Sequence, residues 1–355
     1  MHVTPIAHAF LERATHLRTV NAARDLQYTR APLILNDATR RGLENLGNTC
    51  YGNSLLFALA KVPAVRQWCH EHEHLAIKPP MHGARCPLCM LARDMTQLTN
   101  PQTPLAHYPE VLIHRATWNE AFANTDQQDV HDAFQTLMDR CDNTDAAALH
   151  SLPAYRTMPR ETFIRSDARF STPYNQIFGN LQRVRVTCTL CTNSTEQYER
   201  AHAHSLSLAK EELCDLNLLL ADHLGTEDLD KDWQCENQAC RAKGNGQKTT
   251  EVTHWPPVLV TSLKRFEFNR ALVRYRKVTR PIAYPMVFPI NENVTYTLRA
   301  VIEHRGSTAG GGHYVAYVRA QNEQWYYCND NMRPQIVEDP RAVLQREAYM
   351  LIYER

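Results

Sequence analysis

Hydrophobic positions recur at helical spacing in three parts of the chain. After residue 129 they fall at i, i+3, i+4, i+7, i+8 and i+11, which is the core-facing stripe of an amphipathic helix. This stripe consists of Val130, Ala133, Phe134, Leu137, Met138 and Cys141. Shorter stripes predict a helix that follows Cys50 and ends before Pro63, and a short helix within an N-terminal extension of residues 1–35.

Alternating or continuously apolar segments in the second half of the chain predict strands. They cover residues 181–187, 258–268, 313–319 and 325–328. No apolar run approaches the roughly 18 residues that a membrane-spanning helix needs. We therefore expect a chain that does not span a membrane.

Composition narrows the class of protein. With 355 residues the chain is long enough for two or three structural units around a large core. Its 39 basic and 38 acidic side chains give a net charge of +1, which offers no support for binding to nucleic acid or to a membrane surface. Its 11 cysteines, an odd number, favour free and metal-bound thiols in an intracellular reducing compartment, the cytoplasm or the nucleus.

The segment from Gly42 to Ser54 places a cysteine directly after a glycine-marked loop. Cys50 would begin a helix, where unpaired N–H groups and the helix dipole stabilise a thiolate and lower the pKa of a thiol from about 8.5. Asn45, five residues upstream, carries an amide that can donate to an oxyanion beside the sulfur. The alternative is a buried cysteine that only packs in the core, and the residues alone leave the two readings about even.

One of the 17 histidines stands in an unusual setting. Three glycines precede His313, which opens a predicted strand, and a second strand ends just before Asn329. If the two strands pair in antiparallel fashion, the side-chain oxygen of Asn329 accepts from the imidazole and fixes its orientation, as in cysteine–histidine–asparagine hydrolases. A satisfied surface or core histidine is the alternative reading.

These segments resemble the two boxes of the ubiquitin-specific proteases, the cysteine box around Cys50 and the histidine box from His313 to Asp330. Further matches lie between the boxes in the expected order: Asp126–Phe134, Phe178–Leu181 and Leu263–Phe266. The likeness covers residues from about 32 to 355. It implies a papain-like α+β fold, with a helical thumb at about 36–175, β fingers with a zinc ribbon at about 176–257, and a β palm at about 258–355.

The resemblance also implies a thiol-dependent deubiquitinase, which hydrolyses the isopeptide or peptide bond after the C-terminal glycine of ubiquitin. Cys50 is the expected nucleophile, His313 the base and then the acid, and Asn329 the residue that orients His313. Asn45 is expected to stabilise the oxyanion, and Asp330 to be an auxiliary residue. The rival expectations are a catalytically silent ubiquitin-binding scaffold and a protease for a ubiquitin-like modifier.

Substrate-binding residues are expected near the start of the helix at 130–141 and beside His313. Gln128, Asp129 and Asp132 lie off the apolar stripe, where carboxylates suit the arginines of ubiquitin's tail. The alternative is a solvated acidic face near a helix N-terminus. By resemblance, loops at 269–280 and 306–312 cover the tail. Gly312 then allows close backbone approach, and Tyr314 packs beside the narrow tunnel.

Two pairs of cysteines have the residue types of a zinc site: Cys188 with Cys191, and Cys235 with Cys240. Each pair on a turn can place two sulfurs about 2.3 Å from one ion. The resemblance identifies the set with the zinc ribbon of the fingers, although the second pair has four intervening residues where the family has two. The charge balance and the flanking boxes oppose the alternative of a nucleic-acid-binding ribbon.

A second zinc site is a further candidate. His82, Cys86 and Cys89 offer three ligands and His74 a fourth. A solvated histidine run before a helix near Cys89 is the alternative, and the sequence favours neither. No organic cofactor is expected. The expected partners are ubiquitin, ubiquitinated proteins and, as the resemblance allows, regulatory proteins, but neither nucleic acid nor a membrane.

Overall fold

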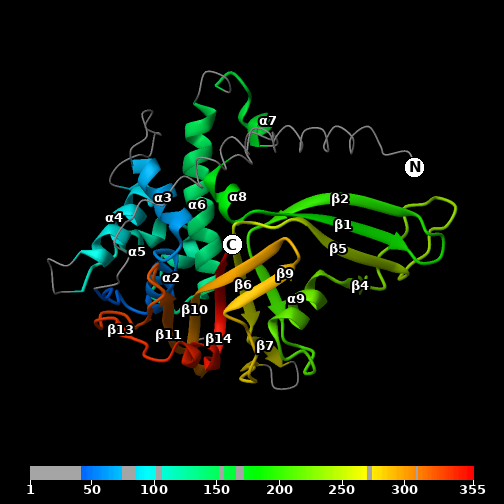
Figure 1. Cartoon of the computed structure of the whole chain (residues 1–355). Coiled ribbons are helices and arrows are strands. Elements are labelled where there is room, and N and C mark those ends of the chain that lie inside the picture. The colour runs from blue at the N-terminus through cyan, green and yellow to red at the C-terminus, as the bar shows by residue number, and fades with distance from the viewer. Residues whose placement is uncertain are drawn as a thin grey trace.

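The computed structural model describes residues 41–73, 85–100, 106–151, 156–164, 172–269, 274–308 and 311–355. The expected N-terminal extension, residues 1–35, lies outside these ranges. Helices come first along the chain and most strands follow, so the two kinds of element form separate parts of the molecule (Figure 1). No helix in the described ranges is both long enough and apolar enough to cross a membrane.

The helical part corresponds to the predicted thumb. Its helices are α2 (Cys50–Leu59), α3 (Pro63–Glu73), α4 (Pro87–Thr99), α5 (Glu110–Ile113), α6 (Val130–His150), α7 (Arg160–Ile164) and α8 (Pro173–Phe178), with 3-10 turns at Arg115–Thr117 and Glu120–Phe122. The helix predicted after Cys50 is confirmed as α2, all of whose residues are buried. Pro63 opens the next helix, where its missing N–H leaves no bond unmade.

Helix α6 confirms the predicted amphipathic stripe. Its six predicted apolar residues, from Val130 to Cys141, are each 0% exposed and belong to one core with α2, α4 and strands of the palm. Asp129 is the N-cap, because its side chain accepts a hydrogen bond from the backbone N–H of His131. The cap fixes where α6 begins and therefore where the acidic residues at its start lie.

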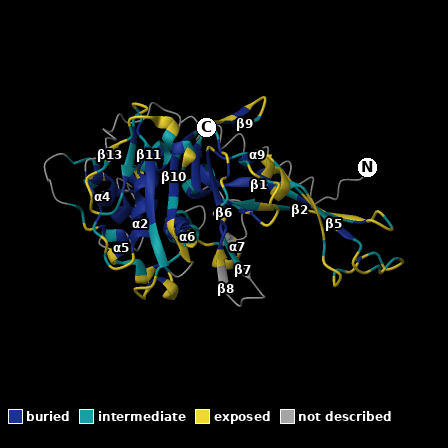
Figure 2. Ribbon diagram, turned by 90° about the horizontal axis from the view of Figure 1, so that it is seen from below, coloured by how far each residue is buried: buried dark blue, intermediate teal, exposed yellow. Residues whose placement is uncertain are grey.

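An eight-stranded sheet forms the palm, in the order β13-β12-β11-β10-β14-β6-β3 with β9 paired to β10. The strands are β3 (His204–Ser207), β6 (Val258–Lys264), β9 (Val287–Asn291), β10 (Val294–Thr308), β11 (Gly311–Arg319), β12 (Trp325–Cys328), β13 (Gln335–Ile336) and β14 (Ala348–Glu354). Figure 2 shows the central strands of this sheet as buried. Alternate side chains feed two cores, since Ala316 packs with the helices of the thumb and Tyr317 with the opposite cluster.

The predicted pairing of the strands around His313 is confirmed. Strand β11 pairs in antiparallel register with β12 through Ala316 and Cys328, and with β10 through His313 and Arg305. The chain therefore leaves β12 beside the start of β11. This register brings Asn329 next to His313.

The strand predicted at 258–268 is confirmed except at Arg265, which divides it into two strands. Strand β6 ends at Lys264, and the following residues form a separate hairpin of β7 (Phe266–Asn269) and β8 (Arg274–Lys277). The physical cause is Arg265, which is buried and donates to the backbone oxygens of Ala348 and Val278. Because a buried guanidinium must find acceptors, the chain leaves the sheet where these oxygens are within reach.

A four-stranded sheet, the fingers, projects to one side of the palm (Figure 1). Its order is β2-β1-β5-β4, with β1 (Asn180–Cys188), β2 (Ser194–Ala201), β4 (Thr226–Asp228) and β5 (Gly246–His254). Strand β1 confirms the strand predicted at 181–187, whereas the edge strand β2 contains no buried residue. Strand β3, from the same part of the chain, belongs to the palm sheet, and helix α9 (Leu216–Leu224) packs on the palm.

Candidate active site

Cys50 is the first residue of α2 and is 2% exposed. The turn before it holds Gly47 and Asn48 at φ values of 89° and 53°, a left-handed conformation that glycine and asparagine tolerate best. This turn lets the Asn45 side-chain oxygen accept from the backbone N–H groups of Gly47 and Thr49, at 3.1 and 3.0 Å. The oxygen of the Asn45 amide is thus tied into its own loop, and its NH2 group remains for other partners.

His313 faces both Cys50 and Asn329. Its Nε2 lies 2.7 Å from the side-chain oxygen of Asn329. The pKa of His313 is raised from 6.5 to about 9; a hydrogen bond with Cys50 is the largest cause, the contact with Asn329 adds to it, and burial opposes it. A thiol, an imidazole and an amide joined in this order favour a thiolate–imidazolium pair.

Asp330 makes no direct hydrogen bond to His313, because its Oδ2 lies 4.0 Å from His313 Nε2. Its two carboxylate oxygens instead accept from the amide nitrogens of Asn45 and Asn53, each at 2.8 Å. The backbone of Asp330 is left-handed, with φ of 40°. Asn45 and Asp330, which are 285 residues apart in the chain, are therefore in direct contact.

Two of the three polar side chains predicted to bind substrate have partners within the protein. Asp129 caps α6 and also accepts from the hydroxyl of Tyr349. Gln128 donates to the backbone oxygen of Ala121 at 2.9 Å. Asp132 is exposed, although partial burial and the charge of Asp129 raise its pKa. Asp132 is thus the carboxylate of this group that faces solvent.

Gly312 and Tyr314 flank His313 in β11. Gly312 has φ of 158°, and a Cβ there would lie 2.4 Å from the ring of His304, so a side chain has no room. The carbonyl of Gly312 accepts from Gln127 at 2.5 Å, which ties β11 to the loop before α6. Tyr314 is buried with its ring edge-on to that of His304. The predicted covering loop at 306–312 is largely part of the β10–β11 hairpin, and residues 309–310 lie outside the described residues.

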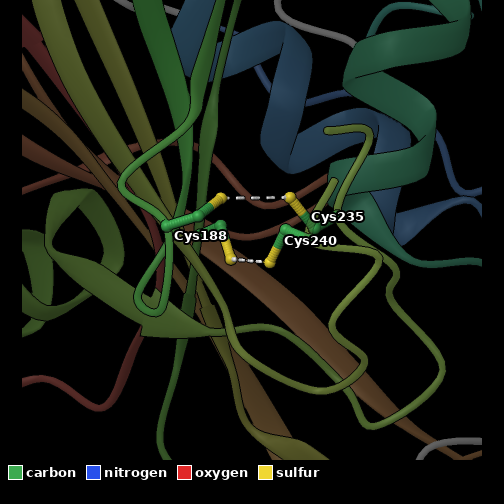
Figure 3. Close-up of side chains that lie close together, drawn as sticks. Cys188, Cys235 and Cys240 are labelled. Carbon is green, nitrogen blue, oxygen red and sulfur yellow. Dashed lines mark hydrogen bonds between the residues drawn. The ribbon is translucent and has the colours of Figure 1, made fainter. Parts of the chain in front are cut away.

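The fingers carry four cysteine side chains directed toward one another (Figure 3), and we call Cys188, Cys191, Cys235 and Cys240 the fingertip cluster. Sulfur distances are 3.9 Å from Cys188 to Cys240 and 3.6 Å from Cys191 to Cys235. Tetrahedral zinc with Zn–S bonds of about 2.3 Å requires sulfurs about 3.8 Å apart. The pKa of the Cys235 thiol is raised to about 12, and burial is the largest cause. The neighbouring sulfurs of Cys191 and Cys188 raise this pKa further. Closely spaced thiolates repel one another unless a cation lies between them. The donor set therefore fits a zinc ion.

Cys235 and Cys240 are separated by more residues than the family pattern has, and these residues form a turn. The backbone oxygen of Asn237 accepts from the N–H of Cys240 at 2.9 Å, and its side-chain oxygen accepts from the N–H of Ala239 at 3.0 Å. Arg241, which follows, is left-handed with φ of 51°. The longer spacing therefore still brings Cys240 back to the other sulfurs.

A second group of metal-ligating side chains lies buried between α3 and α4; we call His72, Cys86 and Cys89 the inner cluster. Nε2 of His72 lies 3.1 Å from the sulfur of Cys86, and Nδ1 lies 2.9 Å from a carboxylate oxygen of Asp145. A histidine that binds metal through one nitrogen commonly donates to a carboxylate through the other. The inner cluster has this arrangement.

Sequence reasoning missed two side chains that the structure brings into these groups. His74 and His82, the imidazoles predicted for the second metal site, lie outside the described residues, and the imidazole beside Cys86 belongs to His72. Asn53 was likewise not singled out, although it lies one helical turn after Cys50. That spacing was the available signal, since residues three apart share a face of a helix.

Comparisons with known proteins agree with the fold. The family model described as ubiquitin carboxyl-terminal hydrolase matches residues 41–353. Ubiquitin carboxyl-terminal hydrolase 23 of Arabidopsis thaliana is 28% identical over 330 residues, which cover 88% of this chain and 35% of the relative. Ubiquitin carboxyl-terminal hydrolase 42 of Homo sapiens is 29% identical over 326 residues, which cover 88% of this chain and 23% of the relative. The chain thus spans well under half the length of either relative.

Solved structures share the predicted α+β fold. The SAGA Ubp8/Sgf11/Sus1/Sgf73 DUB module bound to ubiquitin aldehyde is similar with a TM-score of 0.72 at 22% identity, covering 95% of this chain and 74% of that chain. The Ubp8-Sgf11-Sgf73-Sus1 SAGA DUB module is similar with a TM-score of 0.68 at 22% identity, covering 95% and 72%. Because the family model extends over nearly the whole chain, the protein belongs to the ubiquitin carboxyl-terminal hydrolase family.

Proposed function

We propose that this chain is a thiol-dependent deubiquitinase that hydrolyses the isopeptide or peptide bond after the C-terminal glycine of ubiquitin. The observation that carries the proposal is the connected set of Cys50, His313 and Asn329, in which a hydrogen bond with Cys50 raises the pKa of His313 to about 9. The similar module bound to ubiquitin aldehyde supports ubiquitin as the ligand. The proteins around Ubp8 in that module support regulatory protein partners as well.

In the first half of the reaction, the Cys50 thiolate attacks the carbonyl carbon of the terminal glycine. A C–S bond forms, and the carbonyl π electrons move to the oxygen, where the Asn45 NH2 donates a hydrogen bond to the resulting oxyanion. His313, held by Asn329, gives its proton to the leaving amine as the C–N bond breaks. The products of this half are a free amine and a thioester between Cys50 and ubiquitin.

In the second half, water replaces the amine. Neutral His313 takes a proton from a water molecule whose oxygen attacks the thioester carbon, and Asn45 again stabilises the oxyanion. When the C–S bond breaks, its electron pair returns to sulfur and ubiquitin leaves with a free carboxyl group. His313 keeps the proton, so the thiolate–imidazolium pair is restored for the next cycle.

We propose that the ubiquitin tail enters between the start of α6 and β11. Asp132 is the carboxylate available to an arginine of the tail, because its side chain is exposed. Asp129 and Gln128 bind the tail by exchanging their internal partners for it. Gly312 and Tyr314 form the palm side of the passage, where the lack of a side chain at Gly312 lets the ring of His304 pack against the backbone.

The fingertip cluster is proposed to hold one structural zinc ion, bound by its four sulfurs. Bound zinc supplies no chemistry to the reaction in this place, since all four positions of a tetrahedral site are filled by protein. The inner cluster is proposed to hold a second structural zinc through His72, Cys86 and Cys89, with Asp145 orienting the imidazole.

Metal analysis tests both zinc sites. We expect two zinc ions per wild-type chain and one in each of the variants C188S/C191S and C86S/C89S. Cys214→Ser is the matched control, because Cys214 is exposed and belongs to neither cluster. A C188S/C191S protein that keeps its fold but contains no zinc would exclude the second site.

Reaction with ubiquitin that ends in an electrophile tests the proposed function. We expect one covalent adduct at Cys50 and hydrolysis of a ubiquitin coumarin amide, with both lost in Cys50→Ala. Binding of ubiquitin without adduct or hydrolysis would favour the silent scaffold. An adduct only with a probe built on a ubiquitin-like modifier would transfer the proposal to that modifier.

A further inference from the structure

Asn53 is a buried polar residue of α2 whose side chain reaches the palm. It is 1% exposed, and its amide nitrogen lies 2.8 Å from Oδ1 of Asp330. The same nitrogen lies 3.2 Å from each of the backbone oxygens of Leu43 and Glu44. Its amide oxygen is buried and has no hydrogen-bond partner among the described residues. A buried amide with an unpaired oxygen is uncommon. The position of Asn53 therefore depends on the hydrogen bonds that its amide nitrogen makes.

Asp330 receives hydrogen bonds from three points of the thumb. Its backbone oxygen accepts from the N–H of Leu43 at 2.7 Å, while Oδ1 accepts from Asn53 and Oδ2 from Asn45. We call Leu43, Asn45, Asn53 and Asp330 the thumb–palm junction. The contact is close, because a Cβ on the neighbouring Gly42 would lie 2.4 Å from the backbone of the residue after Asp330. Hydrogen bonds between backbone and short side chains therefore fix this junction.

Together with the bonds from Gly47 and Thr49 to its oxygen, the junction fixes where the Asn45 amide points. Asn45 has two amide hydrogens, and Asp330 accepts one of them, which leaves the other for an oxyanion. A carboxylate is held against rotation only when both of its oxygens are bound, and Asn53 binds the second oxygen. Without Asn53, Oδ1 of Asp330 would be a charged acceptor with an unmade hydrogen bond, and the carboxylate would turn to find another donor.

We propose that Asn53 is a positioning residue for oxyanion stabilisation, which holds the Asp330 carboxylate so that this carboxylate directs Asn45 at the oxyanion. The inference rests on the proposed function, and it divides the site into two units. Asn53, Asp330 and Asn45 serve the oxyanion, whereas His313 and Asn329 prepare the thiolate.

Two ubiquitin reagents separate these units. Hydrolysis of a ubiquitin coumarin amide passes through an oxyanion. Alkylation by ubiquitin that ends in a bromoethyl amide does not, because the thiolate sulfur bonds to the CH2 carbon as bromide leaves with the electron pair of the C–Br bond. We expect Asn53→Leu, which keeps the volume but not the hydrogen bonds, to lower kcat for hydrolysis about tenfold to 100-fold. KM and the alkylation rate should change less than about twofold.

Three control variants show whether the effect is specific to the oxyanion. Asn45→Ala, like Asn53→Leu, should slow hydrolysis and leave alkylation nearly unchanged. Asn329→Ala should slow both hydrolysis and alkylation. Ser54→Ala should leave both rates unchanged, because Ser54 is equally buried on α2 but donates to Tyr51 of its own helix at 2.9 Å. If Asn53→Leu slows the two reactions equally, or neither of them, the inference is wrong.

A measurement without substrate tests the contact between Asn53 and Asp330 separately from the proposed function. Unfolding in urea of Asn53→Leu, Asp330→Ala and the double variant gives the coupling between the two side chains. Each single variant should raise the equilibrium constant for unfolding. In the double variant we expect this constant to rise by a factor at least about threefold smaller than the product of the two single factors. Additive effects would contradict the inference. Wild-type protein inert toward both ubiquitin reagents would instead overturn the proposed function.

Discussion

The thumb–palm junction and the fingertip cluster both join chain segments that are far apart in the sequence, but they differ in how much apolar core lies beneath them. The junction lies on a large core to which α2, α6 and the palm strands contribute. The fingertip cluster closes a sheet whose edge strand β2 has no buried residue. The polar contacts of the junction therefore orient side chains within a structure that apolar packing already stabilises. In the fingers, where the edge strand adds no buried residue, the cysteines stabilise the structure instead.

This difference predicts that the two regions fail in different ways. A change at the junction or beside it should remove chemistry and leave the fold, because apolar burial continues to hold α2 against the palm. Loss of the zinc proposed for the fingertip cluster should remove structure from the fingers and leave the chemical groups in place. Each of the following variants tests one side of that contrast.

The largest effect is expected at Cys50. Cys50→Ala should lower the hydrolysis of a ubiquitin coumarin amide by about 10⁴-fold or more, because no other group can form the thioester. The free energy of unfolding, measured in urea, should change by about 1 kcal/mol or less, since only a small side chain is shortened. Cys328→Ala is the matched control. Cys328 is buried in the same core, so its change to alanine should alter stability by a similar amount and leave the rate unchanged.

Asn329 should have the next largest effect, and it carries a pH signature. Since the pKa of His313 is raised from 6.5 to about 9, the imidazolium persists at neutral pH, and kcat/KM should fall as pH rises through about 9. Asn329→Ala removes an acceptor that raises this pKa, so the fall should move to lower pH while kcat decreases roughly tenfold or more. A pH–rate profile with an unmoved basic limb would show that Asn329 does not hold His313.

Removing the zinc proposed for the fingertip cluster should have a smaller effect on the rate and a local effect on structure. In Cys188→Ser/Cys235→Ser, we expect the amide hydrogens of β1, β2 and β5 to exchange faster, while those of α2 and β11 remain protected. If the fingers bind ubiquitin, KM rises by about tenfold, equivalent to about 1.4 kcal/mol, with kcat little changed. Faster exchange throughout the thumb and palm would mean that the two regions are not separable.

The smallest effect is expected at Asp132. Asp132→Asn should raise KM for the ubiquitin substrate roughly twofold to fivefold without lowering kcat, because an exposed ion pair contributes about 1 kcal/mol or less. The difference from wild type should shrink in high salt, which screens exposed charges. Asp139→Asn, a change at an exposed acidic residue further along α6, should leave KM unaltered.

The sequence predicts best what depends on neighbours in the chain. The apolar spacing defines α2 and α6, alternation defines β1, and the glycines before His313 mark the start of β11. The break at Arg265 could not be predicted in this way, since one of its acceptors belongs to Ala348. The spacing from Cys50 places Asn53 on the same face of α2, but its partner Asp330 is 277 residues away and could not be predicted from local periodicity.

The fingertip cluster and the inner cluster follow the same rule. The fingertip cysteines were identified because each pair is close in sequence, and the longer second spacing is accommodated by a turn at Asn237. The inner cluster was identified only in part, because several histidines precede Cys86 and only folding selects His72 among the described ones. Orientation of that imidazole by Asp145, which lies on a different helix, is also a product of tertiary structure.

The contact between Asn45 and Asp330 has a consequence for protein synthesis. The two residues are 285 positions apart, so the ribosome delivers Cys50 and its helix long before the segment that completes the proposed site. An incomplete chain therefore carries the Cys50 thiol without His313, Asn329 or Asp330 beside it. Under the proposed mechanism, peptide-bond hydrolysis begins only when the palm strands near the end of the chain have closed on the thumb, which makes catalytic activity a sensitive report of complete folding.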